Sequence, residues 1–143
     1  MTARAELERL ARQARDELAA AGLPLSHEGL APDLQCGVTV RVTMWEPDDG
    51  VVHADWRPSP RLSRVAVDAL RHKHLDHPAL HQQGAVSQAM ADAVITILTA
   101  AGFTARHTTN DYLPYGVDVL AAPEGPPAWA VHDDELTMPG WSG

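Results

Sequence analysis

The chain has 143 residues, enough for one hydrophobic core and too few for two separate domains. It carries 19 acidic and 11 basic side chains, and the resulting net charge of −8 repels phosphate backbones, so we expect no nucleic-acid partner. No apolar run approaches the roughly 20 residues that a membrane-spanning helix needs, so we expect no membrane partner.

Apolar residues recur at helical spacing in the first segment, residues 3–21. Thr2 can accept a hydrogen bond as the N-cap, and Gly22 can adopt the left-handed conformation that ends a helix. The sequence therefore predicts a helix, followed by a loop over residues 24–36 that contains two prolines.

A β-hairpin is predicted next, because β-branched residues alternate with polar ones over residues 37–45 and apolar residues continue over residues 51–56. A loop over Glu46–Gly50, in which the glycine is free to take positive φ, places Arg41 opposite Asp55. One face of the hairpin is then apolar, and the other holds a cross-strand ion pair.

A second helix is predicted after the hairpin. Ser59 is placed to cap its N-terminus, and Pro60 occupies the first helical position, where its missing N–H costs nothing. This helix should end near residues 72–75, because Pro78 disfavours helical conformation in the residue before it.

A third and more apolar helix begins between residues 78 and 86 and stops at Gly102. Two short strands are predicted over residues 103–109 and 115–121. The last residues are rich in proline and glycine and are expected to form an extended tail.

The stretch HKHLDHPALH, residues 72–81, holds four histidines and one aspartate. Its first six residues resemble the H-x-H-x-D-H zinc-ligand run of the metallo-β-lactamase-like hydrolases, which would assign zinc ligation to His72, His74, Asp76 and His77. In that family the run follows a strand, whereas a helix is predicted before it here, and only 66 residues follow His77 to supply the family's later ligands. The resemblance is confined to these six positions.

A simpler zinc site is an alternative for the same residues. If the helix continues through the run, His72 and Asp76 share one face; if it breaks at Lys73, the loop can gather three ligands. A purely structural interpretation is also open. Asp76 or His77 would cap the third helix, while His72 and His74 would interact with the negative end of the second.

The elements predict a single α+β domain over residues 1–122, followed by a Pro/Gly-rich tail over residues 123–143. Their order is α-β-β-α-α-β-β, with about three helices packed on a mostly antiparallel sheet of about four strands in two hairpins. So few helices cannot cover both faces of the sheet, which leaves one face available to a partner.

These features predict a small acidic binding module of the adaptor, chaperone-like or inhibitor and immunity type. No complete catalytic constellation is present, which disfavours an enzyme, and no cofactor is expected. We expect a cytoplasmic protein, because the lone Cys36 requires no oxidising compartment. The predicted binding surface, for a protein or peptide partner or for a second copy in a homodimer, consists of Trp45, His53, Tyr112 and Tyr115. The alternative is a zinc-binding protein or metal-dependent hydrolase that uses the cluster at residues 72–81.

Overall fold

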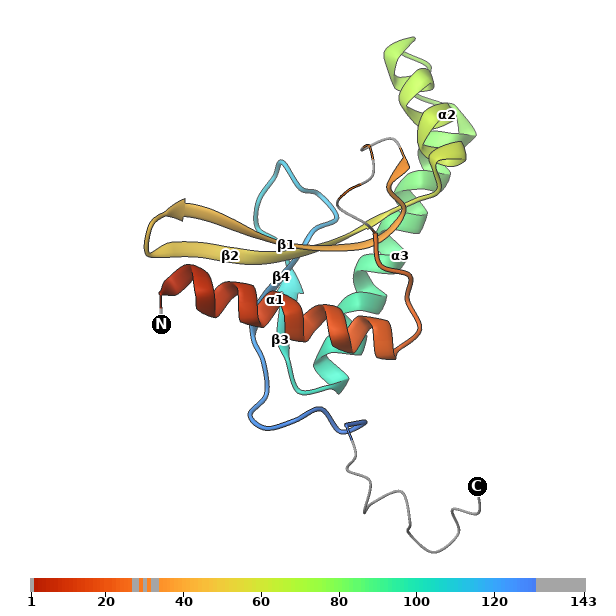
Figure 1. The fold of residues 1–143 in the computed structure, drawn as a ribbon. Helices are drawn as coiled ribbons and strands as arrows, with labels where there is room; N and C mark the ends of the chain where they lie inside the picture. The colour runs from red at the N-terminus through yellow and green to blue at the C-terminus, as the bar shows by residue number, and fades with distance from the viewer. Residues whose placement is uncertain (1, 27–28, 30, 32–33, 131–143) are drawn as a thin grey trace, which may run out of the picture.

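The computed structural model describes residues 2–26, 29, 31 and 34–130, and over these residues it shows three helices and one antiparallel sheet of four strands (Figure 1). The strand order is β1-β2-β4-β3. The predicted α+β class and element order are therefore confirmed. The elements are α1 (Ala3–Ala20), β1 (Gly37–Glu46), β2 (Asp49–Arg57), α2 (Pro60–Arg71), α3 (Pro78–Ala100), β3 (Thr104–His107) and β4 (Val117–Ala121).

The ends of α1 follow from the predicted capping residues. The Thr2 hydroxyl accepts a hydrogen bond from the backbone N–H of Ala5 at 3.1 Å. At the other end Gly22 has a φ of 93°, and the N–H of Leu23 donates to the carbonyl of Leu18 at 3.1 Å. This bond satisfies a carbonyl that the end of the helix would otherwise leave unpaired.

One face of the sheet is covered by α1 and α3, which both pack against it. Strand side chains alternate between faces, so the apolar residues of all four strands point toward these helices. Burial of this layer supplies the main hydrophobic stabilisation of the fold. The buried core consists of Ala11, Ala14, Leu18, Val38, Val40, Val52, Ala54, Ala91, Val94, Leu98, Phe103, Val117 and Val119.

The turn of the β1–β2 hairpin differs from the predicted one. Glu46 pairs with Asp49, so the turn has two residues instead of the expected five-residue loop. Gly50 lies within β2, and its φ is not positive. A Cβ atom there would lie 2.6 Å from the Met44 sulfur, so glycine is needed for close packing at the β-bulge and not for a left-handed turn.

The changed turn also corrects the predicted register. Arg41 lies opposite His53 and not opposite Asp55, a difference of two residues. A shift of two residues keeps every side chain on its original face. The hydrophobic alternation therefore could not distinguish the two registers.

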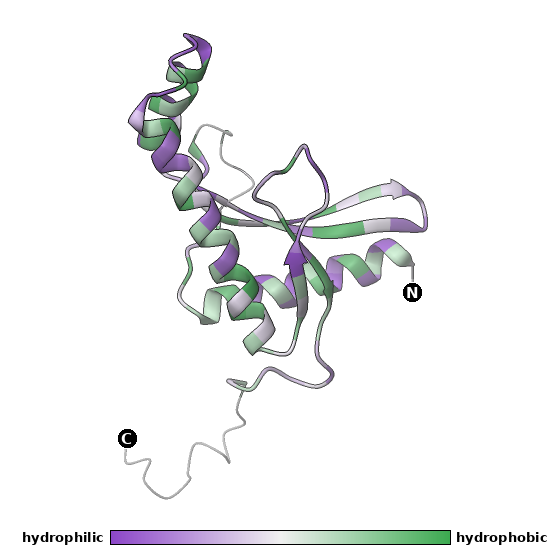
Figure 2. Ribbon diagram, turned by 180° about the vertical axis from the view of Figure 1, so that it is seen from behind, coloured by the Kyte–Doolittle hydropathy of each residue, from purple (hydrophilic) through white to green (hydrophobic). Residues whose placement is uncertain are grey.

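Helix α2 lies beside the first part of α3 and extends beyond the sheet (Figure 1). Ser59 caps it as predicted, and among the described elements it packs only against α3. Ala66 and Ala69 form the buried contact, while Val65 and Leu70 are about half exposed. Hydrophobic and hydrophilic positions are accordingly mixed along this part of the molecule (Figure 2).

The first residues of the predicted tail lie against the body of the protein. Nε1 of Trp129 donates a hydrogen bond to the Glu17 carboxylate of α1 at 3.0 Å. Trp141 and the rest of the tail lie outside the described residues. None of the helices in the described part of the chain has the length and apolar character required to cross a membrane.

Candidate binding site

The sheet face opposite α1 and α3 carries charged side chains from separate strands. His53 of β2 and Asp118 of β4 are cross-strand partners, and Nδ1 of His53 lies 3.4 Å from Oδ1 of Asp118. Both side chains are buried, with 11% and 8% of their surface exposed. Oδ2 of Asp118 lies 3.8 Å from Nε of Arg106 on β3. The buried carboxylate is thus placed between an imidazole and an arginine.

A second group of charges lies beside the first. Nη2 of Arg41 is 3.7 Å from Oδ1 of Asp55, so the predicted ion pair is present although the two residues are not directly opposite each other. The hydroxyl of Thr39 donates to the same carboxylate. Asp55 therefore has two partners on β1, which hold it against the sheet.

The segment between β3 and β4 closes a cavity of about 530 Å³ beside these charges. We term it the tyrosine cavity. Its walls combine charged side chains of the sheet with aromatic and apolar groups, a composition suited to an amphipathic ligand. It is lined by Arg41, Val42, Thr43, His53, Asp55, Trp56, Ser87, Tyr112, Leu113, Pro114, Tyr115 and Gly116.

Three of the four residues in the predicted binding surface line this cavity. His53 is largely buried in it, Tyr115 is partly exposed, and Tyr112 is 93% exposed at its rim. Trp45 does not line the cavity. It lies near the end of the hairpin and is 57% exposed.

Local hydrogen bonds fix the segment that carries both tyrosines. The N–H of Thr108 donates to the carbonyl of Gly116 at 2.9 Å, which closes the base of the loop. Within it, the Asn110 side chain accepts from the N–H of Tyr112 at 2.9 Å, an Asx turn of the kind that asparagine favours. The loop is therefore held by its own backbone and side chains.

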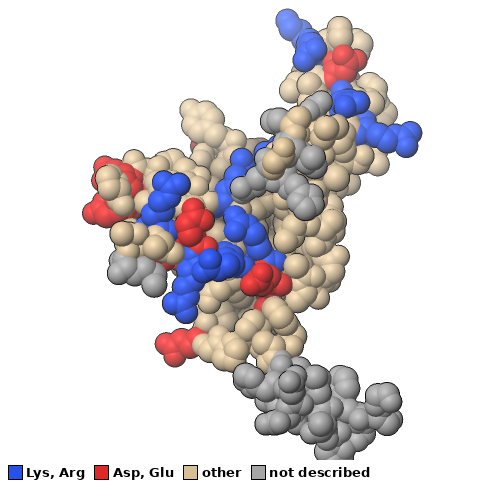
Figure 3. Space-filling model, viewed as in Figure 1, with Lys and Arg blue, Asp and Glu red and all other residues tan. Residues whose placement is uncertain are grey.

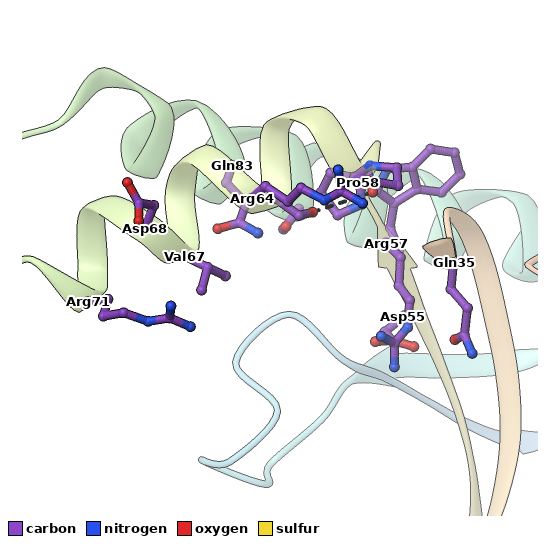
Figure 4. Close-up of a pocket in the computed structure, with 13 residues that line it drawn as sticks. Gln35, Asp55, Arg57, Pro58, Arg64, Val67, Asp68, Arg71 and Gln83 are labelled. Carbon is purple, nitrogen blue, oxygen red and sulfur yellow. Dashed lines mark hydrogen bonds between the residues drawn. The ribbon is translucent and has the colours of Figure 1, made fainter. Parts of the chain in front are cut away.

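A second cavity, of about 650 Å³, adjoins the first and shares Asp55, Trp56 and Ser87 with it. We term it the arginine cavity. It lies between the end of β2, the outer face of α2 and the first part of α3 (Figure 4). Its other lining residues are Gln35, Arg57, Pro58, Pro60, Ser63, Arg64, Val67, Asp68, Arg71 and Gln83.

Three arginines face the arginine cavity from two elements. Arg64 and Arg71 are about two helical turns apart on α2, so they project from one face; in Figure 4 Arg71 lies across the cavity from Arg57 of β2, while Arg64 reaches toward Pro58. Nε of Arg57 is buried and makes no hydrogen bond within the described residues. A buried guanidinium donor without an acceptor favours a ligand that brings one.

The arginine cavity was not predicted from the sequence. A local signal exists, because five of the eleven basic residues and only one acidic residue lie within residues 57–73. Basic side chains are also visible on α2 in Figure 3. The position of α2 beside the end of β2 has no signature in the sequence, since it depends on how α2 packs against α3.

The residues of the predicted zinc site lie on the connection between α2 and α3. The helix breaks at Lys73, which has a φ of 59°. His77 caps α3, as the structural interpretation predicted, and its Nδ1 accepts from the backbone N–H of Ala79 at 3.0 Å. Nδ1 of His72 turns back to the carbonyl of Asp68 at 2.9 Å.

The break does not bring the four predicted ligands together. Among the residues that the structure describes, no three His, Cys, Asp or Glu side chains are placed to hold a metal ion. The rings of His72 and His74 have centroids 6.1 Å apart, while His77 is turned toward its own helix. Zinc binding by His72, His74, Asp76 and His77 stays a prediction.

The two cavities offer a ligand a joined surface of guanidinium groups, amide side chains and aromatic rings. Such a surface can accept carboxylates in bidentate hydrogen bonds and pack apolar side chains against Trp56 and Tyr115. The chain matches no protein-family model, and comparison with curated proteins and with solved structures finds no similar protein.

Proposed function

We propose that this protein is a binding module that holds an acidic, extended segment of a partner protein in the arginine and tyrosine cavities. The observation that carries the proposal is that Arg57, Arg64 and Arg71 line one cavity. Adaptors, chaperone-like proteins and inhibitors all act by such binding. We place the activity in the cytoplasm, because nothing in the cysteine content calls for an oxidising compartment.

Charge supports an acidic ligand. A chain with a net charge of −8 repels anions at long range. The three arginines that line one cavity create a local positive charge, opposite in sign to the net charge of the molecule. The acidic residues that line the cavity are Asp55 and Asp68, and Asp55 is already paired with Arg41. A carboxylate ligand is the group that this arrangement binds best.

The aromatic part of the surface supports a peptide over a small anion. Trp56 lines both cavities, and Tyr115 and Leu113 line the tyrosine cavity next to it. An extended peptide presents side chains in alternation, so it can place carboxylates at the arginines and apolar groups at the rings. Aromatic and arginine side chains are also the residues that contribute most to protein interfaces.

The test is binding of two labelled peptides of equal length, one alternating glutamate with leucine and one alternating lysine with leucine, followed by fluorescence anisotropy. We expect the acidic peptide to bind and the basic peptide not to bind. Arg57→Gln and Arg71→Gln should each raise the Kd about tenfold, equivalent to about 1.4 kcal/mol. Higher salt should weaken binding, since the contacts are between charges.

Arg61→Gln is the matched control, because Arg61 is an exposed arginine of the same helix that does not line the cavity. It should leave the Kd unchanged. Equal binding of both peptides, or an equal loss in Arg61→Gln and Arg71→Gln, would contradict the proposed site.

Zinc binding through residues 72–77 is the competing hypothesis from the sequence. The geometry gives it less support, because no three His, Cys, Asp or Glu side chains among the described residues are placed to hold a metal ion. A zinc titration separates the two hypotheses without reference to the peptides.

A further inference from the structure

Strand β1 forms one edge of the sheet, and its outer side faces a cavity of about 800 Å³. The strand is ten residues long and rich in β-branched residues, which suits it to pairing with another strand. The only bridge on that side, within the described residues, joins Val38 to Leu25. Beyond Val38, no segment in residues 2–26, 29, 31 and 34–130 pairs with this edge, which suits it to accepting a further strand.

The backbone groups that face the open edge can be identified from Val38. Its N–H donates to the carbonyl of Pro24 at 2.9 Å, and its carbonyl accepts from Ser26 at 2.8 Å, so both groups point away from β2. Backbone groups alternate in direction along a strand, so Val40, Val42 and Met44 point the same way.

Only the first of these three residues has a described partner on that side. The carbonyl of Val40 accepts a hydrogen bond from Nη2 of Arg15 at 2.6 Å. The outward groups of Val42 and Met44 make no backbone hydrogen bond to another described segment. A row of unpaired donors and acceptors of this kind is a template for strand addition.

We propose that β1 pairs antiparallel with β1 of a second copy of this chain, around a twofold axis at Val42. An axis at Val42 pairs the outward groups of Val40, Val42 and Met44 with one another across the two copies, whereas an axis at Thr43 would place Val40 opposite Glu46, beyond the β-bulge. An axis at Val40 would require the N–H of Val38, which already donates to Pro24, and an axis at Met44 would run into the β-bulge. The axis at Val42 requires only that the Val40 carbonyl accept a second hydrogen bond beside that from Arg15.

The side chains agree with this register. Val40 lies opposite the partner's Met44, which continues the apolar face, and Arg41 lies opposite the partner's Thr43, so no like charges meet. Both signs of charge line the edge cavity, through Glu8, Arg15 and Arg41. Figure 3 shows basic and acidic side chains intermingled over this region. A surface that carries both signs can complement a copy of itself across a twofold axis.

The test is the dimer dissociation constant of the full chain by analytical ultracentrifugation. Val42→Pro removes an outward N–H from each copy and should weaken the dimer at least about tenfold, whereas Val42→Thr keeps the N–H and should leave it nearly unchanged. Thr43→Lys places two cations opposite Arg41 residues and should weaken the dimer about tenfold. Thr43→Glu should tighten it severalfold.

The variants Thr43→Lys and Thr43→Glu keep the proposal testable if Val42→Pro does not fold, because the two new side chains differ chiefly in the sign of their charge. A chain that is monomeric up to about 1 mM, or a dimer that is indifferent to Val42→Pro and to the sign of the charge at residue 43, would overturn the proposal. Capture of a foreign strand at β1 with no self-association would overturn it as well. The inference does not depend on the proposed function.

Discussion

Nδ1 of His53 and Oδ1 of Asp118 face each other at 3.4 Å across β2 and β4, and neither atom makes a hydrogen bond within the described residues. Both side chains are buried on the sheet face that carries the tyrosine cavity. Asp118 also lies 3.8 Å from Arg106 through its other oxygen, whereas Asp118 is the one ion-pair partner that His53 has among the described residues. Removing Asp118 leaves Nδ1 of His53 buried without a partner, and removing His53 leaves the buried Asp118 with Arg106 alone; either loss costs more than the net value of the contact.

We expect Asp118→Ala and His53→Ala each to lower the free energy of unfolding by about 2 kcal/mol. The double variant should lose about 1 kcal/mol less than the two single losses together, because the interaction can be removed only once. Urea denaturation of the four proteins measures this coupling.

The matched control is the pair of Asp92 and His107, whose Oδ1 and Nε2 atoms lie 3.0 Å apart but whose side chains are 59% and 52% exposed. Its coupling should be no more than about 0.5 kcal/mol, since solvent screens exposed pairs. Equal coupling in the two cycles would show that burial does not strengthen the pair of His53 and Asp118.

Local structure could be predicted from the sequence because its causes are local. Thr2, Ser59 and Gly22 act within one turn of their helices, and the hydrophobic period distinguishes helices from strands. The hairpin register could not be predicted, because the hydrophobic pattern repeats every two residues. It therefore looks the same in two registers that differ by two residues. In the folded chain Gly50 lies opposite Met44, where a Cβ atom would come within 2.6 Å of the Met44 sulfur, and no local pattern encodes this close approach.

The binding role of Trp45, His53, Tyr112 and Tyr115 stays a prediction. His53, Tyr112 and Tyr115 were grouped as polar or aromatic residues outside the core, and they do line one cavity. The pairing of His53 with Asp118 depends on β2 lying beside β4, a contact between distant parts of the chain. No local pattern encodes that neighbour.

Lys73→Gly should stabilise the protein by about 0.5 kcal/mol. Lys73 adopts a φ of 59° where α2 ends, a conformation that disfavours side chains with a Cβ atom. Glycine relieves this strain, although its greater freedom in the unfolded chain offsets part of the gain. Lys73→Ala keeps the Cβ atom and should leave the free energy of unfolding nearly unchanged. A loss of stability in Lys73→Gly would show that the lysine side chain contributes more than its backbone conformation costs.

Zinc should leave the melting temperature of the protein unchanged, and His74→Ala should behave like the parent chain. The reason is that the described residues place no three ligands together at the connection between α2 and α3. Differential scanning fluorimetry with and without zinc measures this, since a ligand that binds only the native state raises its stability. A zinc-dependent rise that disappears in His74→Ala would support the zinc hypothesis in place of the binding module.

Gly37→Ala should destabilise the protein far more than Gly22→Ala, although the two glycines have similar positive φ values of 98° and 93°. A Cβ atom on Gly37 would lie 2.5 Å from the carbonyl oxygen of Pro24, whereas one on Gly22 would meet nothing within 4 Å. Backbone strain alone should cost Gly22→Ala about 1 kcal/mol in the free energy of unfolding.

Gly37→Ala adds a clash with backbone that cannot move without breaking the hydrogen bond between Pro24 and Val38. We therefore expect a loss of about 3 kcal/mol, measured by urea denaturation beside Gly22→Ala. Equal losses in the two variants would mean that the segment before β1 yields freely. The hydrogen bonds that hold the Val38 backbone groups toward Pro24 and Ser26 would then be weak. The register inferred for two paired β1 strands depends on the direction of those groups, so it would no longer be supported.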